Sequence, residues 1–321
     1  MKQWKSMICE ADEGKTLEEI LRAAGFSRKE ISRQKFIPDG IILDGEKCRV
    51  TAKVHTGQLV TLNFRERGEE GKGKEDVQRQ KNRLPASWET KDSGQKSDPS
   101  ILYEDDCLLI VEKPSGLSCH PGPGHYLDNL GSMAMAYCQE KGEEYPIRQI
   151  GRLDKDTSGI VVFAKDKVTA ARLWQQRREG TLQKTYYAVV HGRLRPAEGI
   201  IDSPMGKVPG EKNKMCVCPG AMSAITNYRV IREENYEGKE LSVVECTLVT
   251  GRTHQIRVHM ASLGHPLLGD RIYGIPDGAP GLCLHAGKIR LLQPFTGKEI
   301  NITKTRRFEI FQEEKPWNRN E

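Results

Sequence analysis

The sequence predicts an α+β protein in which a small N-terminal module precedes a larger second domain. Three observations support this prediction. Helix-capping patterns followed by short apolar runs occupy residues 14–64, a charged segment follows at 65–100, and strand-like and helix-like runs are mixed from residue 101 onwards. A length of 321 residues suits about two domains, and a 37% hydrophobic content suits an ordinary core.

Two short helices are expected at the start of the N-terminal module. Thr16 with Glu19, and Ser27 with Glu30, each have the spacing of a capping box. Gly25 stands where the first helix should end, because glycine accepts the left-handed conformation common there. The pattern therefore predicts a helix–turn–helix unit.

Short strands are expected after these helices. Residues 41–43 and 59–64 are apolar and strand-like, and the pair Asp44-Gly45 is a favoured hairpin turn. This order of elements resembles the RNA-binding module named for a small-subunit ribosomal protein. Asp44 departs from that pattern, which more often has Asn, and leaves the RNA affinity of the module open.

A cluster of basic residues accompanies the second helix of the module. The resemblance places RNA contacts there, on Arg28, Lys29, Arg33 and Lys35. A solvated helix face explains the same charges equally well.

Residues 65–100 are interpreted as a flexible linker. They hold 9 basic and 8 acidic residues and very few that could build a core, so burial could not offset the entropy lost on ordering. The domain boundaries that follow are a module at 1–64, the linker at 65–100, a second domain at 101–312 and a disordered tail at 313–321.

The second domain opens with strand and helix signals in turn. Residues 107–111 form an apolar run that ends at Lys113-Pro114-Ser115-Gly116. A helix is expected from Asn129 to Lys141. Another should follow Asp166 as its N-cap, with three side chains facing inward: Val168, Ala171 and Leu173.

Further strands and one helix are expected in the second half of the domain. The strands are residues 184–191, 224–231 and 241–249, and the helix runs from near Thr253 to Gly264.

Composition excludes several classes of protein. No apolar run approaches the roughly 20 residues that cross a bilayer, and the N-terminus lacks a secretory signal. The net charge of +6 is compatible with a polyanionic partner without requiring one. Nine scattered cysteines without a Cys-x-x-Cys pair favour free thiols in a reducing cytoplasm over a metal site, so we expect no metal.

One loop motif is the most informative part of the chain. Gly151-Arg152-Leu153-Asp154-Lys155-Asp156-Thr157-Ser158-Gly159 lies between strand-like residues 148–150 and 160–164, which places Asp154 on a tight connection in a sheet. Three other motifs follow the same family pattern in the same order. They are Glu112–Leu117 with His120-Pro121-Gly122, Lys184–Val190, and Thr250–His259 with Pro266, Gly269-Asp270 and Tyr273-Gly274.

These four motifs together resemble the RluA-type pseudouridine synthases over residues 101–312. Gly151 replaces the usual His of the loop motif. The resemblance implies the pseudouridine synthase fold, a large, mostly antiparallel bent sheet with flanking helices and a central basic cleft. It also implies isomerisation of uridine in structured RNA, ribosomal or transfer, by a monomer without a cofactor.

The resemblance assigns catalytic roles to three residues. Asp154 matches the indispensable carboxylate, Arg257 matches the arginine that pairs with it, and Tyr186 matches an active-site tyrosine with a base-like role. A carboxylate suits the reaction because it can attack as a nucleophile or take a proton from the sugar. A cation beside it would keep it ionised when the substrate covers the site.

The resemblance also suggests residues that contact RNA. Arg152 matches the arginine that fills the space left by a flipped-out uridine; a salt bridge to Asp156 or to the linker is the alternative. Contacts to phosphate or the target nucleotide are expected from Arg252, His254 and Gln255. Lys113 and His120 are either rim contacts or turn residues.

Three alternatives to this interpretation are another catalytic residue and two other classes of function. Asp156 competes with Asp154, although an Asp before Thr-Ser is commonly a hydrogen-bonding loop residue. A non-catalytic RNA-binding protein with a degenerate second domain is the second alternative. A hydrolase that uses Asp154 and Asp156 as an acid/base pair is the third, and the close spacing of the two on one loop disfavours it. No Gly-rich nucleotide-cofactor loop is present, which disfavours a methyltransferase.

Overall fold

The computed structural model describes residues 2–37, 39–64, 100–122, 128–143, 147–211 and 213–304. The expected linker and C-terminal tail lie outside these residues, apart from Ser100. In the described ranges, no helix has the length and apolar character needed to cross a membrane.

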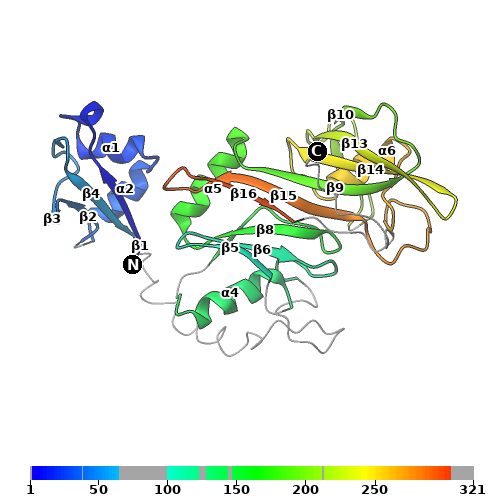
Figure 1. Cartoon of the computed structure of the whole chain (residues 1–321), viewed down its shortest axis with the longest axis horizontal. Coiled ribbons are helices and arrows are strands. Elements are labelled where there is room, and N and C mark those ends of the chain that lie inside the picture. The colour runs from blue at the N-terminus through cyan, green and yellow to red at the C-terminus, as the bar shows by residue number, and fades with distance from the viewer. Residues whose placement is uncertain are drawn as a thin grey trace.

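The N-terminal module is a four-stranded sheet packed against two helices (Figure 1). The strand order is β1-β4-β2-β3, and both capping boxes predicted from the sequence are confirmed. The elements are β1 (Lys2–Met7), a 3-10 turn (Glu10–Asp12), α1 (Leu17–Ala23), α2 (Arg28–Gln34), β2 (Ile41–Leu43), β3 (Glu46–Lys47) and β4 (Leu59–Phe64). Strand β1 was not expected from the sequence, because it is mostly polar and lacks an apolar strand pattern. It forms by antiparallel pairing with β4.

Turn chemistry in the module agrees with the sequence. Asp44 and Gly45 both have positive φ, 50° and 86°, as the tight hairpin turn between β2 and β3 requires. Gly25 has a φ of 86° just after α1, where its left-handed backbone ends the helix.

Among the described residues, Arg172 makes polar contacts between the module and the second domain. The Arg172 guanidinium donates to the Ala24 and Pro294 carbonyls and lies over the rings of Phe26 and Phe295, 4.2 and 4.5 Å from their centroids. Val168 packs against the same apolar core of the module. The described contacts therefore join the module to α5 (Lys167–Glu179), which carries Val168 and Arg172, and to Phe295 in the segment after β15 (Leu284–Leu292).

The second domain is built on a ten-stranded sheet. Its main path is β10-β13-β14-β9-β15-β8-β6-β5, with β16 paired to β15 and β7 paired to β8. Neighbours are antiparallel except for β15 and β8, which confirms the expected mostly antiparallel sheet. The strands are β5 (Ser100–Glu104), β6 (Leu108–Lys113), β7 (Arg148–Ile150), β8 (Ser158–Ala164), β9 (Gln183–His191), β10 (Glu198–Asp202), β13 (Ile225–Tyr236), β14 (Lys239–Leu248), β15 (Leu284–Leu292) and β16 (Glu299–Thr303). A separate hairpin pairs β11 (Met205–Lys207) with β12 (Met215–Val217).

Three helices accompany this sheet. They are α4 (Leu130–Glu140), α5 (Lys167–Glu179) and α6 (Gln255–Ser262). Asp166 caps α5 as expected, whereas Asn129, expected as the first residue of its helix, is the N-cap of α4. On α5, Ala170 is buried and Ala171 is exposed, which corrects the expected inward position of Ala171.

Alternating side chains of β6 separate two apolar layers. Leu109 and Val111 belong to the cluster that contains the buried face of α4, whereas Leu108 and Ile110 belong to the cluster that contains Leu173 of α5. All seven residues of β8 are buried, because both faces of the sheet are covered there. The centre of the sheet is therefore a rigid support for the loop that precedes β8.

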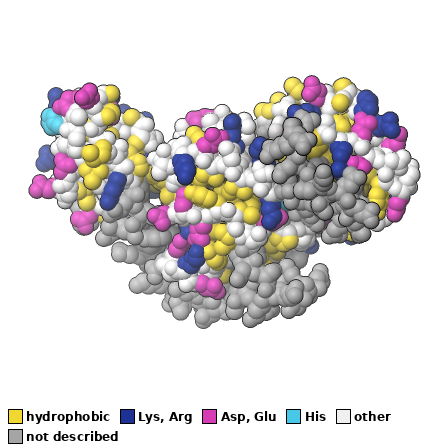
Figure 2. All heavy atoms as spheres, viewed as in Figure 1, with side chains coloured by type: hydrophobic (Ala, Val, Ile, Leu, Met, Phe, Trp, Pro, Cys, Tyr) yellow, Lys and Arg dark blue, Asp and Glu magenta, His cyan; other side chains and the backbone are white. Residues whose placement is uncertain are grey.

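Charges on the face drawn in Figure 2 are interspersed, with Lys and Arg side chains among Asp and Glu. The expected basic cleft is not evident on this face.

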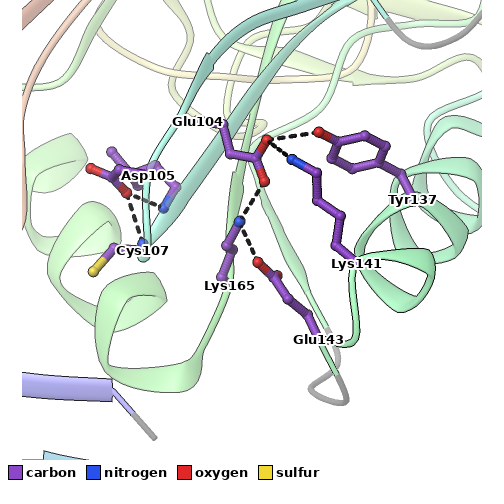
Figure 3. A network of polar contacts seen from close by, with 8 residues as sticks. Glu104, Asp105, Cys107, Tyr137, Lys141, Glu143 and Lys165 are labelled. Carbon is purple, nitrogen blue, oxygen red and sulfur yellow. Dashed lines mark hydrogen bonds and ion pairs between the residues drawn. The ribbon is translucent and has the colours of Figure 1, made fainter.

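A polar network fastens α4 to the edge of the sheet (Figure 3). Glu104 accepts hydrogen bonds from Lys141, Lys165 and Tyr137, each at 2.7 Å, and Lys165 also donates to Glu143. Burial acts to raise the pKa of Glu104, but these three donors outweigh it and hold the pKa at about 2.

Glu104→Gln should weaken acid sensitivity and lower stability at neutral pH. The contribution of an ionised Glu104 is present above its usual pKa of 4.5 and is lost as the pH falls towards about 2. The variant should therefore lose stability less steeply over that window, measured as the urea midpoint at pH 7 and at pH 3. Glu198→Gln, at an exposed site in β10, is the control, and equal pH dependence in the two variants would contradict the prediction.

Candidate active site

Asp154 lies on the loop that joins β7 to β8. It is half-buried and lines a cavity of about 380 Å³. The cavity walls come from this loop, α5, β9 and the segment between β14 and α6; the polar and aromatic residues are Arg152, Asp154, Thr157, Trp174, Arg177, Tyr186, Arg252, Thr253, His254, Gln255 and Arg257. The structure thus gathers Asp154, Tyr186 and Arg257 around one cavity.

A buried lysine holds this loop in place. The side chain of Lys113 is fully buried, and its ammonium donates to the carbonyls of Pro114, Leu117 and Lys155 at 2.7–2.9 Å. Burial lowers the pKa of Lys113 to about 8, so the amine is still mostly protonated at neutral pH. Of the two roles considered for Lys113, the structure supports the turn residue.

The Asp154 carboxylate has no hydrogen-bond or ion-pair partner within the described residues. Its charge nevertheless reaches several neighbours: it favours the protonated forms of Arg257, His254 and Tyr186. An unpartnered carboxylate in a cavity is available to a substrate.

Arg257 does not pair with Asp154, which corrects the expectation from the sequence. Its guanidinium instead makes a bidentate ion pair with Asp270, with Nε–Oδ2 and Nη2–Oδ1 distances of 2.7 and 2.6 Å. The side chains are 4% and 0% exposed, so the pair is buried. Because Asp270 belongs to a different loop, only the folded chain could reveal this partner.

His254 and Tyr273 extend the Arg257–Asp270 pair. The Tyr273 ring lies 5.1 Å from the Arg257 guanidinium, and its hydroxyl accepts from the Met215 N–H and lies 2.8 Å from His254 Nδ1. Burial lowers the pKa of His254, which favours a neutral imidazole. His254 has a φ of 58°, a left-handed backbone at the start of α6 that is uncommon outside glycine.

Gln255 is a structural residue, which corrects the expectation that it contacts RNA phosphate or the target nucleotide. It is 2% exposed, and its amide bonds the Arg252 N–H, the Ile225 carbonyl, and the hydroxyls of Thr250 and Thr226. These bonds fasten the start of α6 to β13. Arg252 remains at the cavity wall and donates to the Ser223 carbonyl.

Tyr186 is a buried phenol. Burial raises its pKa to about 12, with Asp154 acting in the same direction and Arg177 against it. The hydroxyl is therefore protonated at neutral pH and offers a hydrogen-bond donor. A base-like role would require a partner that takes this proton.

Arg152 is exposed at the cavity and has no ion-pair partner within the described residues. The alternative salt bridge to Asp156 is therefore not formed. Asp156 is exposed and does not line the cavity, while its backbone carbonyl accepts from the Ser115 hydroxyl at 2.7 Å. Electrostatically, Arg152 lies near His120 and, after the larger effect of burial, lowers its pKa.

Arg177 was not singled out from the sequence. It lies on α5, lines the cavity, and its guanidinium is 5.3 Å from the Trp174 ring. A Cβ atom at Gly151 would collide with Nη1 of Arg177. The Gly at position 151, which also has a φ of 73°, thus leaves the space that this arginine occupies. The only trace of this in the sequence is the i, i+3 spacing of Trp174 and Arg177.

The basic residues of the module lie apart from the cavity lining. Arg28, Lys29, Arg33 and Lys35 are exposed on and just after α2, and Arg28 is 4.0 Å from Glu18. Phe36, which follows them, is 76% exposed. An exposed ring beside basic side chains is a feature that the sequence interpretation overlooked.

The sequence also matches a known protein family. The profile of the family described as RNA pseudouridylate synthase matches residues 107–262. An uncharacterized RNA pseudouridine synthase of Bacillus subtilis, YhcT, is 42% identical over 203 residues, which are 62% of this chain and 66% of that protein. A second from Bacillus subtilis, YlyB, is 32% identical over 275 residues, or 84% of this chain and 83% of that protein.

A ribosomal relative and a solved structure agree with these matches. The ribosomal large subunit pseudouridine synthase D of Nitrosomonas europaea is 38% identical over 208 residues, covering 62% of this chain but only 59% of that protein. The structure of human RNA pseudouridylate synthase domain containing 1 superposes with a TM-score of 0.55 at 25% identity, over 69% of this chain and 86% of that one. The chain thus spans slightly under two thirds of the length of some of these relatives.

Proposed function

Because the chain belongs to the RNA pseudouridine synthase family, we propose that it isomerises uridine in RNA to pseudouridine, with Asp154 as the catalytic carboxylate. The observation that carries the proposal is the position of Asp154, unpartnered among the described residues, in a cavity that it shares with Tyr186 and Arg257. The loop that carries it lies between β7 and β8, the two strands expected from the sequence on either side of it.

The reaction breaks the bond from N1 of the base to C1′ of the ribose, turns the uracil, and joins C5 to C1′. The C5 proton is lost and N1 gains one, so substrate and product are isomers and no oxidant or cofactor is required. Asp154 either attacks the sugar as a nucleophile or removes a proton from it. The absence of donors to its carboxylate among the described residues leaves both oxygens available.

The neighbours of Asp154 divide the remaining roles. Arg257, held in place by its ion pair with Asp270, lies within electrostatic reach of Asp154 and supplies a positive group for that carboxylate's role in the reaction. The Tyr186 ring packs against the uracil, and its hydroxyl donates a hydrogen bond during the rearrangement. His254, held neutral, contacts the nucleotide at the cavity wall.

The target uridine must leave its stack to reach Asp154. Unstacking costs a few kcal/mol. Arg152 is exposed beside the cavity and is free to fill the vacated position.

We propose ribosomal RNA as the substrate, with transfer RNA as the alternative. The support is the ribosomal large subunit enzyme among the relatives. A ribosomal substrate would place the enzyme in the cytoplasm. We propose that it acts there as a monomer.

Pseudouridine mapping on total RNA tests the proposal. RNA from cells that lack the protein would be treated with carbodiimide and read by primer extension, alongside cells with the wild type and with Asp154→Asn. Loss of one or a few sites, restored by the wild type alone, is expected and identifies the substrate. Unchanged sites in every strain would favour a non-catalytic RNA-binding protein.

Neutralising the basic side of α2 should weaken RNA binding and its salt dependence. Removing one cation that touches a phosphate reduces the slope of log K against log salt by about 0.7–0.9. Lys29→Gln, Arg33→Gln and Lys35→Gln together should lower this slope, measured by fluorescence titration on the substrate RNA. All three residues are exposed, so the fold should persist.

The matched control removes three other exposed cations of the same module, at Lys47, Arg49 and Lys53. These should leave the slope nearly unchanged. Equal slopes in both triple variants would show that α2 is a solvated helix face.

A further inference from the structure

A second groove opens beside the catalytic cavity. It measures about 330 Å³ and shares Gly151, Arg152, Arg177, Tyr186 and Leu248 with the cavity wall. Its cations are Arg152, Arg177, Arg178 and Lys184, while Glu179 is its one carboxylate and accepts a hydrogen bond from Gln175. The groove is therefore positively charged where it meets the cavity.

Arg177 marks the junction between the two hollows. Its two terminal nitrogens lie against two glycines from different loops: a Cβ at Gly151 would collide with Nη1, and a Cβ at Gly251 would collide with Nη2. One glycine leads into the Asp154 loop and the other into α6. The guanidinium thus bridges the segments that carry Asp154 and Arg257.

The guanidinium of Arg177 is available to bind a ligand, because it does not hold parts of the described structure together by hydrogen bonds. Among the described residues it pairs with no carboxylate and donates to no carbonyl; its contact is the Trp174 ring. Arg172, five residues earlier on α5, shows the contrast, because it donates to two carbonyls and is held by two rings. Exposed arginine donors without internal acceptors suit an anionic ligand.

We propose that Arg177 binds the phosphodiester next to the target uridine, and that the second groove receives the adjoining nucleotide. The proposal rests on the proposed function, since it takes RNA as the substrate. A strand that enters the cavity must leave it along a surface, and this groove is continuous with the cavity at Arg177. Trp174, 41% exposed beside it, offers a ring on which the neighbouring base can stack.

Binding measured without catalysis tests this role. The probe is a twelve-residue oligouridylate, titrated in the Asp154→Asn background at 20–200 mM salt. Arg177→Gln should weaken binding roughly tenfold or more, the effect of losing a hydrogen-bonded charge. The salt slope should fall by about 0.7, as for one phosphate on a single strand. Lys298→Gln, an exposed cation at the turn between β15 and β16, is the control and should change neither value.

A second variant moves the guanidinium without removing its charge. Gly251 is exposed and does not have a positive φ, and the atoms that its Cβ would meet belong to the tip of Arg177. Gly251→Ala should therefore displace Arg177 and reproduce the binding loss, and adding Arg177→Gln should lower affinity little further. Additive losses would overturn the shared site.

The remaining outcomes are also decisive. An unchanged salt slope in Arg177→Gln overturns the phosphate contact, even if activity falls. If the Asp154→Asn chain does not bind the probe at 20 mM salt, the proposal that the second groove receives the adjoining nucleotide is wrong. Failure of the proposed function would show itself separately, as absence of pseudouridine with the wild-type chain.

Discussion

Asp154→Asn should reduce isomerisation by at least about 10³-fold, as expected when a residue that acts directly in the chemistry is removed. The amide has almost the shape of the carboxylate but is a poor nucleophile and a poor base. The variant should fold normally, because Asp154 is half-buried and its carboxylate accepts no hydrogen bond from the described residues. Activity would be followed as tritium release from RNA labelled at C5 of uridine, with circular dichroism and RNA affinity as checks on the fold.

Asp156→Asn is the matched control for this prediction. Asp156 is exposed on the same loop and lies outside the cavity lining, and its contact to Ser115 uses the backbone carbonyl. Its substitution should leave activity close to that of the wild type, because its carboxylate neither lines the cavity nor makes the contact to Ser115. An active Asp154→Asn chain, or an inactive Asp156→Asn chain, would transfer the catalytic role away from Asp154.

Local features of the fold could be predicted because their causes are local. The capping boxes at Thr16 and Ser27 and the N-cap at Asp166 depend on residues three positions apart. The turn at Asp44-Gly45 depends on two adjacent residues. Each was placed correctly from its immediate neighbours.

The parts that failed depend on partners distant in the sequence. Polar β1 becomes a strand because β4 pairs with it. Arg257 pairs with Asp270, which lies 13 positions further along the chain. The family resemblance had suggested only Asp154 as the partner of Arg257. Gln255 looked available for RNA because its two hydrogen-bond acceptors on β13 lie some 30 positions away. Motifs could therefore identify candidate residues. They could not show which of these residues already have hydrogen-bond or ion-pair partners within the folded protein.

The same distinction separates Lys113 and Arg177. Both are basic and both lie near the Asp154 loop, yet Lys113 is fully buried on three carbonyls, whereas Arg177 has no internal acceptor among the described residues. Nothing in the sequence distinguishes a lysine that supports a loop from an arginine that lines a cavity. Burial and hydrogen-bond satisfaction make that distinction.

Asp270→Asn should lower the free energy of unfolding by about 3–5 kcal/mol, because it leaves the Arg257 charge buried without its counterion. Asp270 also accepts from the Ile272 and Tyr273 N–H groups, so its loss loosens the loop that positions Tyr273. Burial acts to raise the pKa of Asp270, but Arg257 outweighs it and the pKa is lowered. Its stabilising effect is therefore present above the usual pKa of 3.8 and is lost below it. Urea unfolding at pH 7 measures the main effect.

The double variant Arg257→Met with Asp270→Asn separates stability from catalysis. Removing both charges removes the buried unpaired cation, so much of the lost stability should return. Activity should not return, because the positive charge behind Asp154 is gone, and RNA affinity should change far less than turnover. A double variant that regains activity along with stability would reduce Arg257 to a structural residue. A single Asp270→Asn change that costs under about 1 kcal/mol would show that the pair contributes no more than an exposed one.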